Sequence, residues 1–134
     1  MRLSPGQSGA TSGDRLFLLR RDRAAAPAMR ALFPSIAQLR LELRFEGTAA
    51  NIPVPQTHIL HPAARAYFVF LCPYADCNGR FDLAAIVNAA VEDSLSRVEG
   101  LLVCGGTRVG GHASRRLCHL HLHYVITSTR DLAP

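Results

Sequence analysis

Four cysteines constrain the fold of this sequence more than any other feature. They follow the spacing C-x4-C-x26-C-x13-C and are Cys72, Cys77, Cys104 and Cys118. A structural zinc site needs four ligands in a tetrahedron, and strand ends followed by tight turns bring such ligands together. Cys72 ends an apolar run and precedes Pro73, whereas Cys104 precedes Gly105 and Gly106. The pattern therefore predicts one zinc ion, Zn2+, held in a closed site by all four cysteines.

The segments around the cysteines resemble a zinc ribbon, with "CPYADCNG" as the first knuckle and "VCGG" as the second. The resemblance covers residues 67–126, with a helix inserted between the two half-sites, whereas zinc ribbons usually carry C-x2-C in each knuckle. The first knuckle is also similar to one knuckle of RING-between-RING domains, but those require eight ligands. The resemblance implies a structural metal site on the four cysteines.

Three other interpretations of the cysteines stay open. Free cysteines are often small buried apolar residues, and Cys118 lies in the apolar register of its segment. A redox dithiol is disfavoured because Cys72 and Cys77 are not a C-x-x-C pair that opens a helix. Two disulfides would require an exported protein, since paired cysteines inside cells more often bind metal.

Hydrophobic periodicity predicts an α+β fold: a small, mostly antiparallel sheet of about four to five strands with one main helix. The helix is expected over about four turns, beginning at the cap Asp82 and ending at Gly100, with Leu95 and Val98 on its apolar face. Alternating or continuous apolar runs predict strands at residues 38–46, 56–60, 65–72, 101–104 and 117–128.

Charge is distributed unevenly along the chain. Residues 1–33 hold six arginines against two aspartates, and the remainder holds nine arginines against eight acidic residues. The formal charge of +5 therefore does not indicate polyanion binding by the whole chain. We expect residues 1–33 to form a disordered or partly helical extension interrupted at Pro27, residues 34–128 the zinc-ribbon-like domain, and 129–134 a tail. Alternatively, translation begins at Met29.

An arginine-rich hairpin is predicted at residues 105–116. Its guanidinium groups at Arg108, Arg115 and Arg116 are suited to phosphate, so nucleic-acid binding through this hairpin is the first alternative function. The aromatic residues that would stack on bases are missing from it. A solvated loop is the simpler interpretation.

Three histidines alternate along the last predicted strand, at His119, His121 and His123. Two neighbours of this set could share a metal ion if His58 or His61 supplied a further ligand, which makes a small metal-dependent enzyme the second alternative. The simpler interpretation is a polar, solvent-facing row on a strand.

Together these patterns predict a small zinc-binding protein that acts as a non-enzymatic protein-interaction module. We expect a protein partner. No run approaches the roughly 18 to 20 apolar residues of a membrane span, and the absence of a signal-like segment favours a cytoplasmic location. The sequence does not indicate the oligomeric state.

Overall fold

The structure is a computed structural model that describes residues 12–47, 55–109 and 115–130. The elements within these residues are α1 (Ser12–Ala25), α2 (Met29–Leu32), β1 (Ile36–Glu46), β2 (Gln56–Leu60), β3 (Val69–Leu71), β4 (Arg80–Asp82), α3 (Ala84–Glu92), β5 (Arg97–Val103), β6 (Thr107–Val109), β7 (Arg115–Leu117) and β8 (His121–Arg130).

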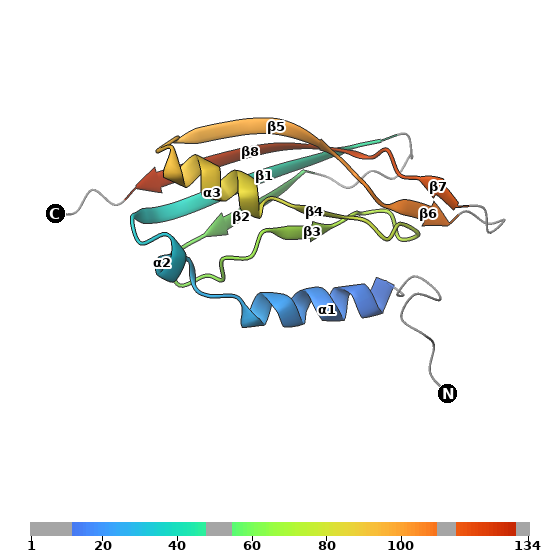
Figure 1. Ribbon diagram of the computed structural model, residues 1–134, viewed down its shortest axis with the longest axis horizontal. Coiled ribbons are helices and arrows are strands. Elements are labelled where there is room, and N and C mark those ends of the chain that lie inside the picture. Colours follow the sequence, from blue (N-terminus) through green and yellow to red (C-terminus); the bar gives the residue numbers. More distant parts are fainter. Residues whose placement is uncertain (1–11, 48–54, 110–114, 131–134) are drawn as a thin grey trace.

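A four-stranded antiparallel sheet in the order β2-β1-β8-β5 forms the centre of the molecule (Figure 1). Alternate residues of β1, from Leu39 to Phe45, are buried on one face, as alternation along a half-buried strand dictates. Leu122 and Ile126 of β8 continue this face, and Val87 of α3 packs in the same core. The α+β prediction with its antiparallel sheet is confirmed.

The opposite face of the sheet carries polar and charged residues. Arg40, Glu42 and Arg44 of β1 lie directly opposite Thr127, Val125 and His123 of β8. Directly opposed residues share a face, so this surface, called the outer face below, points away from the core.

The helix after Asp82 is shorter than the periodicity predicts. It begins at Ala84 with Leu83 at the N-cap position, one residue later than the predicted cap. Asp82 is the last residue of β4, and its Oδ1 accepts a hydrogen bond from the N–H of Ala84 at 2.9 Å. The helix ends at Glu92, and Ser94 takes a left-handed conformation with φ of 55°. Because this conformation reverses the chain, the helix stops after 9 residues rather than four turns.

The residues that follow correct the prediction for Leu95, Val98 and Gly100. Val98 lies in β5 opposite Ile126, and Gly100 lies opposite Tyr124. A Cβ at Gly100 would overlap the Tyr124 ring, so this glycine gives the ring its space and does not end a helix. Leu95 lies in the turn between α3 and β5, where its N–H donates to the carbonyl of Ala90 at 2.9 Å. The spacing of Leu95 and Val98 fits a helix, but the left-handed Ser94 ends the helix before them and β8 pairs with Val98 as a strand.

The predicted strand at 117–128 is divided in two. Its first part belongs to β7, which pairs with β6, and its second part to β8. Cys118 and His119 lie in the break between them. The break is needed because Cys118 must turn toward the other cysteines while β8 continues in the main sheet.

The N-terminal helices α1 and α2 lie on either side of Pro27, where the sequence predicts an interruption. Met29 and Phe33, which precede the predicted domain start at residue 34, are buried in the main core. Residues 1–11 and 131–134 lie outside the described residues, so the domain division stays a prediction. No helix in the described ranges is long and apolar enough to span a bilayer.

Candidate metal centre

The four cysteines come together in one cluster. They lie in the loops and connections next to β3, β5 and β7, at the end of the main sheet where β5 leads to β6 and β7 leads to β8. Cys72 follows β3, and Cys77 lies in the loop between β3 and β4. Cys104 follows β5, and Cys118 follows β7. Cys72 and Cys77 form the first half-site, and Cys104 and Cys118 form the second. In both, the cysteines lie just after a strand or in the loop next to it.

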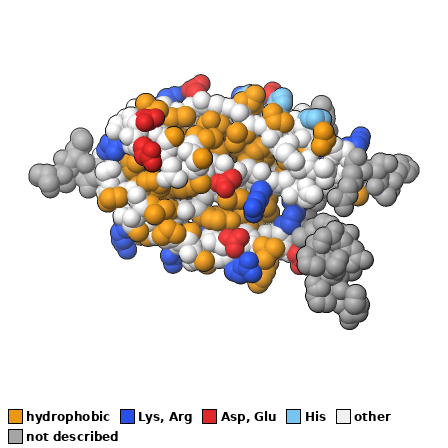
Figure 2. All heavy atoms as spheres, viewed as in Figure 1, with side chains coloured by type: hydrophobic (Ala, Val, Ile, Leu, Met, Phe, Trp, Pro, Cys, Tyr) orange, Lys and Arg blue, Asp and Glu red, His pale blue; other side chains and the backbone are white. Residues whose placement is uncertain are grey.

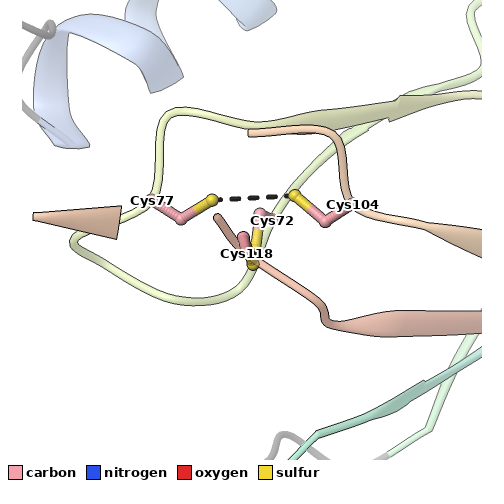
Figure 3. A group of neighbouring side chains, drawn as sticks. All are labelled: Cys72, Cys77, Cys104 and Cys118. Atoms are coloured by element: carbon pink, nitrogen blue, oxygen red, sulfur yellow. Dashed lines mark hydrogen bonds between the residues drawn. The ribbon is translucent and has the colours of Figure 1, made fainter. Parts of the chain in front are cut away.

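The four sulfur atoms lie close enough together to surround a single ion. All four lie within 4.8 Å of one another, and the side chains point toward a common centre (Figure 3). The Sγ atoms of Cys72 and Cys118 are 3.8 Å apart, and those of Cys77 and Cys104 are 3.6 Å apart. Zinc–sulfur bonds of about 2.3 Å in a tetrahedron place the sulfurs about 3.8 Å apart. The cysteines are thus positioned to bind one metal ion.

Each cysteine sulfur also faces the backbone amide of the residue two positions further on. The N–H of Gly79 donates to Cys77 Sγ at 3.3 Å, and that of Gly106 donates to Cys104 Sγ at 3.4 Å. The amides of Tyr74 and Leu120 act in the same way on the sulfurs that precede them by two positions. Thiols that were merely buried apolar groups would not need four such donors, whereas thiolates would be stabilised by them.

Burial shifts the ionisation of the thiols in the absence of a cation. It raises the pKa of Cys72, and it raises that of Cys104 to about 11, with the neighbouring thiols adding to the effect. The pKa of Cys118 is lowered overall. Burial alone would raise it, but hydrogen bonds from the Leu120 amide and the surrounding thiols outweigh the effect of burial. Four thiolates at this depth need a cation, which a metal ion supplies.

Two glycines allow the half-sites to approach each other. A Cβ at Gly79 would overlap the sulfur of Cys104, and a Cβ at Gly106 would overlap the backbone of Gly79. Gly105 lies between Cys104 and Gly106 in the sequence, and a Cβ added there would meet no atom within 4 Å. Close approach, and not an unusual backbone conformation, therefore requires glycine at residues 79 and 106.

The loop that carries Cys77 runs alongside β6 and is bonded to it. The N–H of Asn78 donates to the carbonyl of Thr107 at 3.2 Å, and the N–H of Thr107 donates to Asn78 Oδ1 at 2.8 Å. The N–H of Val109 donates to the carbonyl of Asp76 at 3.1 Å. These bonds join the two half-sites directly, independently of any bound ion.

The side chain of Arg108 adds a further contact between β6 and the loop that carries Cys77. Its Nε donates to Asp76 Oδ1 at 3.0 Å, and its guanidinium lies 4.0 Å from the centre of the Tyr74 ring. Both members of the ion pair are about two-thirds buried, with exposed fractions of 28% and 33%. Arg108 thus ties the hairpin to the loop of the first half-site.

Replacing Arg108 by alanine is expected to lower the free energy of unfolding by about 1–2 kcal/mol, because it removes a partly buried ion pair and a cation–π contact. Urea unfolding of the metal-loaded protein measures the change. Arg40→Ala is the control: its pair with Glu42 is 3.1 Å long but more exposed, and its loss is expected to cost below about 0.5 kcal/mol. Equal effects of the two substitutions would contradict the role of Arg108.

The predicted nucleic-acid residues are only partly described. The guanidinium of Arg108 is engaged by Asp76 and Tyr74, as above, and Arg116 is exposed beside a cleft of about 930 Å³ that Glu46 also lines. The side chain of Arg115 and residues 110–114 of the predicted hairpin lie outside the described residues. Nucleic-acid binding stays a prediction.

The predicted histidine row is only partly present. His121 and His123 lie half-buried on the outer face in β8, but His119 precedes the strand. The Nε2 of His123 is 2.9 Å from Oε1 of Glu46, and this bond lowers the pKa of Glu46. Within the described residues, the four cysteines form the single cluster of three or more metal-ligating groups. The histidines therefore do not converge on a second metal there.

The histidines of the long connection lie apart from this row. The ring of His58 lies 4.9 Å from that of Phe70, and its Nε2 is 3.1 Å from Gln56 Oε1. Burial lowers the pKa of His58, and the charge of Arg23 lowers it further. His58 therefore has local partners and does not serve as a further ligand to the histidine row.

Two parts of the centre were missed by sequence reasoning. The four amide donors follow from the backbone course after each cysteine, of which Asn78-Gly79 and Gly105-Gly106 are the visible signals. The contact between Asp76 and Arg108 joins residues 32 positions apart and has no local signal. The sequence therefore indicated the four cysteines but not the contacts that hold them.

Comparisons with models of protein families, with curated proteins and with solved structures found no match for this chain. The likeness to a zinc ribbon therefore depends on the cysteine pattern and its geometry alone.

Proposed function

We propose that this protein binds one zinc ion through Cys72, Cys77, Cys104 and Cys118 and that it acts as a non-enzymatic protein-interaction module. The observation that carries the proposal is the convergence of four buried sulfurs, each facing a backbone amide. Four sulfur ligands in a tetrahedron favour zinc or iron over magnesium, calcium or manganese. The short distances between the sulfurs favour a single ion over a multi-iron cluster, whose cysteine ligands lie further apart.

The role of this ion is structural. Four protein ligands complete the coordination of zinc and leave no position for water or substrate. The cysteines are also nearly inaccessible, with exposed fractions between 1% and 4%. The metal would tie β5 and β8, which belong to the main sheet, to the loop between β3 and β4.

The interaction surface is proposed to be the free edge of the main sheet. β5 is the last strand in the sheet order and belongs to an edge in the described part of the chain. Its residues Leu101 and Val103 are about half exposed, at 49% and 51%. An apolar edge strand of this kind pairs readily with another strand.

Zinc binding is tested by metal analysis of the purified full chain. We expect one zinc per chain after dialysis, and the strong visible absorption of tetrahedral thiolate coordination after exchange with Co2+. Chelation at neutral pH is expected to change the near-UV circular dichroism, because Tyr74 lies inside the first half-site. Protein that contains no metal and keeps its melting temperature in chelator would overturn the proposal, and stoichiometric iron would replace zinc in it.

A further inference from the structure

Among the described residues, no strand pairs with the edge of β5 that faces away from β8, and backbone groups of alternate residues point to this edge. The even-numbered residues in and beside β5 direct their backbone groups toward the neighbouring strand β8. The N–H of Cys104 donates to the carbonyl of Leu120 at 2.8 Å, and the carbonyl of Ser96 accepts from the N–H of Ser128 at 2.9 Å. Both bonds fit the register of the β5·β8 pair. In antiparallel pairing, the residues between them direct their N–H and C=O groups to the other side. The residues that do so are Arg97, Glu99, Leu101 and Val103.

The side chains of these residues lie on the outer face in a self-complementary order. Arg97 and Glu99 bond to each other, with 2.8 Å between Nη2 and Oε2, and are about 60% exposed. If a second β5 runs antiparallel with Arg97 opposite Glu99 of the other copy, two ion pairs form across the edge.

The other side of β5 carries an apolar hollow that this register would close. The hollow has a volume of about 280 Å³ and lies between α3 and the beginning of β5. Hydrophobic side chains gather over this part of the molecule (Figure 2). Its lining residues are Ala85, Ile86, Ala89, Ala90, Asp93, Leu95 and Val98.

The symmetry axis of this register coincides with the hollow. Pairing of residue 97 with residue 99 places the twofold axis at Val98, which lines the hollow. The small side chains of Ala85 and Ala89 permit the two α3 helices to approach each other there. The charged pairs on one face and the apolar hollow on the other thus select the same register.

We propose that two copies of this chain pair through β5, antiparallel about a twofold axis at Val98, and form one continuous sheet with four strands from each copy. The interface is isologous, as in most homodimers. The inference rests on the proposed function, because it names the partner of the interaction module. It does not depend on which metal the cysteines bind.

Sedimentation velocity of the metal-loaded full chain over a wide concentration range tests the dimer. We expect a reversible monomer–dimer equilibrium in the wild type. Arg97→Glu places like charges opposite each other twice and is expected to weaken dimerisation by about tenfold or more. The double variant Arg97→Glu/Glu99→Arg exchanges the charges and is expected to restore dimerisation.

A matched control exists on an interior strand. Arg40 and Glu42 of β1 form the same type of pair on the same outer face, but β1 is bonded to a strand on each side. Arg40→Glu is therefore expected to leave the dimer unchanged. The inference is wrong if the zinc-loaded wild type stays monomeric, or if Arg97→Glu and Arg40→Glu act alike. Zinc content measured in the same samples separates the two proposals, since metal-free protein contradicts only the metal site.

Discussion

Cys104→Ser is expected to lose the bound zinc and much of the stability of the fold. Cys104 directly follows β5, and its N–H donates to the carbonyl of Leu120 just before β8, so this cysteine is fixed to the end of the main sheet. Structural zinc in small peptides contributes about 10–16 kcal/mol of apparent binding free energy. A domain's whole stability is about 5–15 kcal/mol. Loss of the ion is therefore comparable with the total stability.

Metal analysis, circular dichroism and amide hydrogen exchange measure this effect. Exchange protection is expected to disappear first around β6 and β7, which are short and flank the cysteines. Val87→Ala is the control: Val87 is fully buried in the core, and its truncation is expected to cost about 2 kcal/mol without loss of zinc. A Cys104→Ser protein that keeps one zinc and its wild-type melting temperature would show that Cys104 is not a structural ligand.

Gly79→Ala is expected to have the second largest effect. The added methyl group would overlap the sulfur of Cys104 and crowd the backbone of Gly106. Because both neighbours are held by the second half-site, the loops must separate and the sulfur must move. We expect zinc affinity to fall by about 10- to 100-fold, as when groups that orient metal ligands are changed, and stability to fall by about 1–3 kcal/mol.

Gly105→Ala provides the matched control for this substitution. It adds the same methyl group in the turn beside Cys104, where no atom lies within 4 Å. Its effect on stability is expected to stay within about 0.5 kcal/mol. Competition with a zinc chelator measures both affinities. Similar affinities for the two variants would mean that the approach of Gly79 to Cys104 does not limit metal binding.

The sequence was most informative where a pattern is local. Strict alternation from Leu39 to Phe45 predicted a half-buried strand, and β1 is such a strand. Four cysteines next to prolines, glycines and strand ends predicted one site, and their sulfurs do converge. The sequence signal at Asp82 located the start of α3 to within two residues, because the helix begins at Ala84, whose N–H donates to Asp82 Oδ1.

Where the local sequence pattern did not specify the local structure, contacts with distant residues determined which structure forms. Leu95 and Val98 continue the helical period of α3, but the chain turns at Ser94 and β8 pairs with the residues from Arg97 onward as a strand. The histidine row appeared continuous in sequence, yet the course of Cys118 toward the metal centre separates His119 from His121. In both cases a long-range partner outweighed local preference.

By itself, the amino-acid sequence determined the fold class, the central strand and the four cysteines of the candidate metal centre, because each depends on the spacing of neighbouring side chains. Only the tertiary structure decided how the half-sites are held. Arg108 meets Asp76, and Gly79 meets Cys104, across more than 20 intervening residues. The free edge of β5 was also decided there, because an edge is defined by which strands pair and which do not.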